Sequence, residues 1–284
     1  MTTISLPGPL LLLGAGRMGA AMLEGWLKAG VDASRIMVRD PAPSPQAAQA
    51  IAAHSISLNP DAREMAKAAL LVAAVKPQVM DEALAPVAPL FAARPPLVLS
   101  IAAGRDMASF KAHFGPAAPV IRAMPNTPSA IGRGITGFAA SAEVTGEQKE
   151  LARQLLAALG EVVEVESEEQ IDAVTAVSGS GPAYVFLLAE CLGHAGRKLG
   201  LEAELAGKLA RATVTGAAAL MEQSGQPPGD LRAAVTSPGG TTQAALEVLM
   251  ADDGLCALME RAVAAAEERS RQLAGKNEKR DSGS

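Results

Sequence analysis

The residues of this chain best suited to chemistry stand in one bend, residues 236–242, directly before an amphipathic helical pattern at residues 244–249. Two adjacent glycines and several hydroxyls at the start of a helix leave backbone N–H groups unpaired and directed at one small volume. The helix dipole adds partial positive charge there, which favours a carboxylate or a phosphate. We therefore predict an anion site in this stretch, residues 236–242.

A second glycine-rich loop lies near the start of the chain. Its glycines form a G-x-G-x-x-G pattern between the apolar run 10–13 and a helical pattern at residues 18–29. The first glycine permits a tight turn, the second lets the backbone approach a pyrophosphate, and the third allows close helix–strand packing. A purely structural turn is the alternative, but the flanking strand and helix favour a dinucleotide. The predicted cofactor residues of this loop are Leu13, Gly14, Ala15, Gly16, Arg17, Met18 and Gly19.

The end of the second apolar run gives two conflicting signals about the cofactor. Asp40 stands where a carboxylate accepts hydrogen bonds from a ribose 2′-OH, which favours NADH. Arg39 beside it could instead pair with the 2′-phosphate of NADPH. A solvent-facing Arg-Asp pair ahead of Pro41 is a third interpretation. The sequence thus predicts NADPH or NADH without choosing between them.

Two further loops follow apolar runs at positions where ligands bind in open α/β sheets. In the first, which consists of Ala74, Val75, Lys76 and Pro77, the lysine could contact a phosphate or a ribose. In the second, Asn126 could bond the ribose or the carboxamide of the nicotinamide half. Both loops contain prolines, so a turn without a ligand is the alternative for each.

Small residues at positions 178–184 interrupt a long helical pattern. Pro182 suits the first turn of a helix, and Ser178 or Ser180 could cap that helix. A ligand or a neighbouring chain could come near the backbone here. A kinked helix with Tyr184 in the core is the alternative.

These loops must be positioned by two different kinds of structure. Short apolar runs alternate with helical patterns up to residue 166, which predicts a doubly wound, mostly parallel sheet with helices on both faces. The predicted strands are residues 10–13, 35–39, 70–75, 97–101, 119–123, 135–140 and 161–165, and the helices between them are 18–29, 45–53, 79–88, 107–113 and 147–159. Four helical patterns follow, at residues 172–199, 203–223, 242–251 and 255–273. We predict domains at residues 1–166 and 167–275, and a disordered tail at 276–284.

The all-helical domain has too few elements to cover its own apolar faces. We expect it to pack against a second copy of the chain, with docking inside one chain as the alternative.

Composition narrows the function classes. A net charge of -5 without a basic run argues against nucleic acid, and the apolar stretch 10–13 is too short to cross a membrane. Cys191 and Cys256 lack C-x-x-C spacing, which predicts buried, reduced thiols and no metal site. His54, His113 and His194 lie outside every candidate loop, so no triad is indicated. We expect a soluble cytoplasmic protein.

Taken together, these segments closely resemble the pyrroline-5-carboxylate reductases. The resemblance is carried, in the family's order, by residues 14–19, 74–77, 100–104, 122–128, 177–184 and 235–242. The last two stretches are the specific ones, because many dehydrogenases share the first.

The resemblance implies a Rossmann domain followed by an all-α dimerisation domain that interlocks with its twofold mate, and assembly of such dimers into decamers. It implies reduction of 1-pyrroline-5-carboxylate to L-proline, the last step of proline synthesis, by hydride transfer from NAD(P)H. Ser237 and the N–H groups of Gly239, Gly240 and Thr241 would hold the substrate carboxylate, and Thr242 would place its hydroxyl at the ring nitrogen. Val177, Ser178 and Gly179 would complete the wall of the substrate site.

Two departures from the family's usual residues bear on the cofactor. Asp40 stands where NADPH-using relatives often carry a small hydroxyl residue, and Arg17 replaces a frequent Asn or Gln. Both put the usual NADPH preference in question, and neither affects the reaction.

Two other functions remain as alternatives. A dehydrogenase of the 6-phosphogluconate type would use a lysine on the first long helix after the sheet, but residues 172–190 contain none. A nucleotide-binding regulator without turnover would not need the anion site at residues 236–242, nor the hydroxyl of Thr242.

Overall fold

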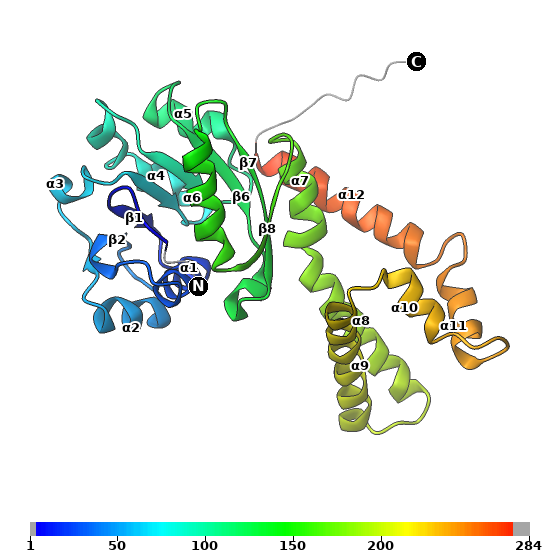
Figure 1. Ribbon diagram of the computed structural model, residues 1–284. Coiled ribbons are helices and arrows are strands. Elements are labelled where there is room, and N and C mark those ends of the chain that lie inside the picture. Colours follow the sequence, from blue (N-terminus) through cyan, green and yellow to red (C-terminus); the bar gives the residue numbers. More distant parts are fainter. Residues whose placement is uncertain (1–3, 275–284) are drawn as a thin grey trace, which may run out of the picture. The chain divides into compact units, whose positions relative to one another are not determined.

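The computed structural model describes residues 4–274 and divides the chain into two compact units (Figure 1). Of the described residues, 4–179 and 266–274 form the sheet unit and 180–265 form the helical unit. The predicted domain boundaries follow the change in sequence character and stay a prediction. The predicted tail, residues 276–284, lies outside the described residues.

The sheet unit is built on one eight-stranded sheet with the order β3-β2-β1-β4-β5-β6-β7-β8. Every neighbouring pair is parallel except β6 and β7. The chain order reverses between β1 and β4, which makes this a topological switch point, where open α/β sheets bind ligands. The strands are β1 (Leu10–Leu13), β2 (Ile36–Arg39), β3 (Ser57–Leu58), β4 (Leu70–Ala73), β5 (Leu97–Ser100), β6 (Val120–Met124), β7 (Gly134–Ala140) and β8 (Gly160–Glu164).

Helices cover both faces of the sheet, as the continuous apolar runs predict. Leu10 and Leu12 of β1 belong to one buried cluster, with Trp26 of α1 and Leu155 of α6. Leu11 belongs to the cluster on the other face, which α4 and α5 complete. The doubly wound fold is therefore confirmed. The helices of this unit are α1 (Arg17–Lys28), α2 (Pro45–Ala53), α3 (Ala62–Met65), α4 (Met80–Leu84), α5 (Met107–Phe114), α6 (Gly146–Ala157) and α7 (Gln170–Val174), together with the end of α12 (Leu255–Leu273).

The antiparallel pair has a simple cause. The connection between β6 and β7 contains only a 3-10 helix, Thr127–Ile131, and is too short for the crossover that parallel neighbours need. β7 therefore folds back beside β6, and β8, which follows α6, runs parallel to β7.

The helical unit consists of α8 (Gly181–Lys198), α9 (Ala203–Ser224), α10 (Pro228–Ala234), α11 (Thr241–Leu249) and the first part of α12. α8 and α9 approach closely through small residues, since a Cβ on Gly196 would lie 3.3 Å from the Cβ of Ala206. Elsewhere the apolar side chains are uncovered: Phe186 is 64% exposed and Leu187 57%. Cys191 and Cys256 are free thiols, but both are exposed in the single chain, so the prediction of burial is wrong for one copy.

Among the described residues, one segment, Gln170–Lys198, is long and apolar enough to cross a membrane, with a mean hydropathy of 1.3. A single such segment is weak support for a membrane span, because helices of soluble proteins pass the same test. Here it is also irregular, since a π-helix at Thr175–Gly179 separates α7 from α8. The absence of a membrane partner stays a prediction.

Candidate active site

The glycine-rich loop joins β1 to α1 at the switch point of the sheet. Gly14 has a φ of +92°, and a Cβ there would lie 2.8 Å from the backbone nitrogen of Val75. A Cβ on Gly19 would lie 2.2 Å from the carbonyl oxygen of Gly14. These two glycines are therefore required by the fold itself. Gly16 has no atom within 4 Å of a Cβ position and is the N-cap of α1, so its backbone is open to a ligand.

A cavity of about 680 Å³ lies at this loop, between the ends of β1, β2 and β4. Its size is in the range of cofactor sites. The predicted residues that line it are Leu13, Gly14, Gly16, Arg39, Asp40, Ala74, Val75 and Lys76. The sequence did not single out the remaining lining residues Asn59, Val79, Glu82 and Ala83, nor assign Pro41 to the site. The cavity and its open glycine backbone fit a dinucleotide.

Asp40 is engaged by its own chain. Its Oδ2 accepts from the backbone N–H of Ala15 at 2.6 Å, and its Oδ1 accepts from that of Ala42 at 2.8 Å. Its backbone N–H donates to the side chain of Asn59 at 3.0 Å, and the amide group of Asn59 donates to its carbonyl oxygen at 2.9 Å. Asp40 therefore braces the glycine-rich loop from the end of β2. The sequence pattern could not identify Asn59 as a residue of this site. Its position depends on its own backbone φ of 51° and on the two-residue strand β3 that precedes it.

Arg39 and Lys76 are the cations of the cavity. The guanidinium of Arg39 lies 3.9 Å from the sulfur of Met65, and within residues 4–274 it pairs with no carboxylate. Lys76 is exposed and opens the 3-10 helix Pro77–Val79. Two positive side chains at one cavity suit a phosphorylated ligand.

Asn126 does not line this cavity. It is 9% exposed, and its Oδ1 accepts from the backbone N–H of Ile135 at 3.0 Å, which ties the loop to β7. Only its NH₂ group is left for a ligand. A contact with the cofactor stays a prediction.

The segment Val177–Gly179 forms the end of the π-helix and belongs to the sheet unit. Such π-helical turns are rare and occur often at functional sites. The hydroxyl of Ser178 donates back to the carbonyl oxygen of Val174 at 2.9 Å, and Ser180, at the N-cap of α8, makes no capping bond with its side chain. The prediction that either serine caps α8 is therefore wrong. Pro182 does lie in the first turn of α8, as predicted.

The bend at residues 237–242 lies in the helical unit, where α11 begins at Thr241 with Gly240 as its N-cap. Gly239 has a φ of +70°, and its N–H donates to the side-chain oxygen of Gln243 at 2.7 Å. The N–H of Gly240 donates to the carbonyl oxygen of Ser237 at 3.0 Å. The expectation that all these N–H groups are unpaired is therefore wrong for the two glycines. In the described chain, the N–H groups of Thr241 and Thr242 remain without an acceptor, as the first turn of a helix requires.

Within residues 4–274, no three His, Cys, Asp or Glu side chains gather as metal ligands would.

Known proteins resemble this chain over both units. Residues 168–273 match the model of the pyrroline-5-carboxylate reductase dimerisation domain, and residues 10–104 match that of the NADP oxidoreductases described as coenzyme F420-dependent. A pyrroline-5-carboxylate reductase of Pseudomonas aeruginosa is 43% identical over 267 residues, which cover 93% of this chain and 96% of the relative.

Solved structures agree with these matches. A pyrroline-5-carboxylate reductase from Coxiella burnetii has a TM-score of 0.86 and 35% identity, covering 95% of this chain and 99% of the other. A pyrroline carboxylate reductase of Plasmodium falciparum, with NADP bound, has a TM-score of 0.78 and 27% identity, covering 94% and 98%. Since these likenesses extend across both the sheet unit and the helical unit, the chain belongs to the pyrroline-5-carboxylate reductase family.

Proposed function

We propose that this protein reduces 1-pyrroline-5-carboxylate to L-proline with NADPH or NADH, the last step of proline synthesis. The observation that carries the proposal is the 43% identity with a pyrroline-5-carboxylate reductase over 93% of the chain. The cavity at the glycine-rich loop supports it, because it offers the space and the open backbone that a dinucleotide needs.

The reaction needs little acid–base chemistry from the protein. NAD(P)H, when bound, supplies a hydride from the nicotinamide C4 to the imine carbon. The ring nitrogen takes its proton from water, and the carbon of the resulting iminium group is then already electrophilic. Orientation of two bound reactants can lower the barrier by about 7–11 kcal/mol, whereas one hydroxyl hydrogen bond contributes about 1 kcal/mol. The Thr242 hydroxyl at the ring nitrogen is therefore assigned to positioning and hydrogen bonding.

The bend before α11 is proposed to hold the substrate carboxylate. The hydroxyl of Ser237 and the N–H groups of Gly239 and Thr241 would donate to it, while Gly240, whose N–H donates to the carbonyl oxygen of Ser237, would line the site. Gln243 makes this assignment more specific, because its side-chain oxygen already accepts from Gly239 at 2.7 Å, as a carboxylate oxygen would. A bound carboxylate would take over that N–H from Gln243. Val177, Ser178 and Gly179 would form the opposing wall.

We further propose that the cofactor site prefers NADPH. Asp40 already accepts from two backbone N–H groups, so its carboxylate serves the loop rather than a ribose. Arg39 lines the same cavity without a carboxylate partner in the described chain and is available for a 2′-phosphate. The NADP-bound relative from Plasmodium supports the same preference.

The helical region of residues 168–273 supports a homo-oligomer, since it matches a dimerisation domain. We propose a homodimer that assembles into decamers, in the cytoplasm, with a small-molecule substrate and with neither nucleic acid nor membrane as partner.

The activity is tested by the loss of NAD(P)H absorbance on addition of 1-pyrroline-5-carboxylate. Thr242→Ala should lower kcat while leaving the NADPH dissociation constant unchanged, and Thr242→Ser, which keeps the hydroxyl, should retain most of the rate. Ser237→Ala should raise the KM for the imine. Silence of the wild-type protein with both cofactors would contradict the proposal and favour a regulator without turnover.

The cofactor preference is tested separately by the ratio of kcat/KM for NADPH to that for NADH. Arg39→Gln should reduce this ratio about tenfold or more by loss of a charge-assisted contact, with little change in the NADH value. A ratio that Arg39→Gln leaves unchanged would remove Arg39 from phosphate recognition.

A further inference from the structure

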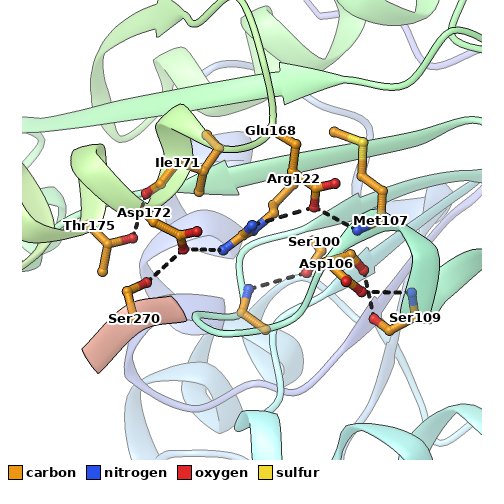
Figure 2. Close-up of polar contacts among 11 residues, drawn as sticks. Ser100, Asp106, Met107, Ser109, Arg122, Glu168, Ile171, Asp172, Thr175 and Ser270 are labelled. Atoms are coloured by element: carbon orange, nitrogen blue, oxygen red, sulfur yellow. Dashed lines mark hydrogen bonds and ion pairs between the residues drawn. The ribbon is translucent and has the colours of Figure 1, made fainter. Parts of the chain in front are cut away.

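A buried charge network in the sheet unit takes no part in the reaction as proposed. Arg122 of β6 is 0% exposed, and Asp172 of α7 is 1% exposed. The guanidinium Nη2 lies 3.1 Å from Oδ1 of Asp172, and Nη1 lies 3.4 Å from Oε1 of Glu168. Ser270, near the end of α12, donates its hydroxyl to the same Asp172 oxygen at 2.8 Å. Figure 2 shows Glu168 and Asp172 each joined to Arg122, and Ser270 joined to Asp172.

Such a network is a poor way to obtain stability alone. Burying ions costs several kcal/mol in desolvation, and apolar residues of similar volume often stabilise a core at least as well. Here the arrangement is also incomplete, because the buried Nε of Arg122 has no hydrogen-bond partner among residues 4–274. Unlike an apolar contact, an ion pair requires specific atoms to meet. It therefore fixes how the packed helix is rotated about its axis and how far it is shifted along the strand.

The helix fixed in this way leads directly into the π-helix. Asp172 lies three residues before its first residue, Thr175, whose hydroxyl donates to the carbonyl oxygen of Ile171 at 2.7 Å. Ser178 donates in the same manner to Val174 at 2.9 Å. The last turn of α7 therefore sets the position of the π-helical backbone.

The same strand contacts the far end of the π-helix. Met124 follows Arg122 by two residues, and residues at this spacing share one face of a strand. A Cβ on Gly179 would lie 3.7 Å from the sulfur of Met124. On β7, a Cβ on Gly137 would lie 2.7 Å from Val174, so the sheet admits α7 at this point only because glycine is there.

We propose that Arg122 and Asp172 are positioning residues for the substrate wall. Their ion pair fixes α7 on β6 so that the π-helix presents Val177, Ser178 and Gly179 at the carboxyl end of that strand. The inference rests on the proposed function for the role of these three residues.

The test replaces the charges by apolar groups. In the double variant Arg122→Met/Asp172→Leu neither member of the ion pair is left buried without the other, and Glu168, whose side chain is 20% exposed, keeps its bond from the N–H of Met107 at 2.7 Å, so the sheet unit should still fold. We expect kcat/KM for 1-pyrroline-5-carboxylate to fall about tenfold to a hundredfold, as for a small misplacement of a site wall, with an unchanged NADPH dissociation constant. Amide hydrogen exchange of residues 175–179 should become faster, while exchange in β1 and β4 stays the same.

The matched control is Glu164→Gln. Glu164 of β8 pairs with Lys149 at 2.6 Å and with Arg153 at 3.0 Å on the surface of the same unit, without a bond to the π-helix. This variant should leave both the kinetic constants and the exchange of residues 175–179 unchanged. A folded double variant with the kinetics of the wild type would overturn the inference, as would a parallel loss of NADPH binding.

Failure of the proposed function would be seen differently. In that case the wild-type protein would not reduce the imine at all, and hydrogen exchange would decide whether the ion pair positions the π-helix. Unchanged exchange of residues 175–179 in the double variant would overturn the positioning role by itself.

Discussion

The two units of this chain differ in how much of their apolar surface they bury within a single chain. In the sheet unit, every residue of β1 and β4 is buried, and helices cover both faces. In the helical unit, only Ala206 and Ala210 are buried among the residues of α8 and α9. The sheet unit can thus complete its core with one chain, whereas the helical unit leaves large apolar side chains such as Phe186 and Leu187 exposed, as protein interfaces do.

This difference between the units bears on which binding step should depend on assembly. The cofactor cavity lies in the unit that folds around its own core. Thr242 and its neighbours lie in the unit whose apolar faces a second copy must cover. Substrate binding is therefore expected to depend on assembly, and cofactor binding is not.

The largest expected effect comes from a charge on the uncovered face. Phe186→Asp in α8 places a carboxylate where the second copy is expected to pack. The free energy of dimerisation should become less favourable by about 4 kcal/mol, which raises the dimer dissociation constant roughly a thousandfold. Sedimentation should show monomers that bind NADPH but no longer reduce the imine.

Ile131→Asp is the matched control in the sheet unit, because Ile131 is 77% exposed there and outside both sites. It should leave assembly and activity unchanged. If Phe186→Asp remained dimeric at low concentration, the two units would not differ as argued, and the uncovered face of α8 would need another explanation.

The sheet unit was largely predictable because most of its strands are short runs of mainly apolar residues. Each of the seven predicted strands is present within about two residues of its expected ends. β3 was missed because two residues, one of them polar, give no periodicity. The role of Asp40 was missed for another reason: its position predicts a ribose contact, but its bonds to Ala15 and Ala42 depend on how the loop closes.

The helical unit was predictable in its long elements and not in its details. The pattern at 255–273 gave α12 with its bounds, while α10, seven residues long and begun by proline, was not expected. At the bend, sequence indicated free N–H groups because it could not show that Gln243 folds back onto Gly239. A hydrogen bond between a side chain and the nearby backbone does not change the hydrophobic periodicity, so the sequence pattern cannot reveal it.

A smaller effect tests whether a second copy lies close to α9. Gly207 has no atom within 4 Å of a Cβ position in the single chain, and it lines a groove of about 850 Å³ with Phe186. If residue 207 faces solvent in the assembled protein, Gly207→Ala should stabilise α9 by about 1 kcal/mol. Against a closely packed copy it should instead destabilise by about 1–3 kcal/mol.

We expect the second result, seen as a lower Tm in calorimetry. Gly146→Ala at the start of α6 is the control, because a Cβ there also meets no atom within 4 Å and no partner is expected at that site. Its Tm should stay the same or rise slightly. A rise in Tm for both variants would place Gly207 in solvent and weaken the contrast between the units.

The smallest effect concerns a defect inside the otherwise complete core of the sheet unit. The hydroxyl of Thr136 on β7 is buried without a hydrogen-bond partner in the described structure, whereas that of Thr213 on α9 donates to the carbonyl oxygen of Leu209 at 2.8 Å. Thr136→Val should therefore remove an unpaired polar group and stabilise the protein by about 1 kcal/mol, or roughly 2–4 °C in Tm. Thr213→Val should give no such gain. A lower Tm for Thr136→Val would mean that this hydroxyl has a partner, such as an ordered water, and that the core is more polar than its side chains indicate.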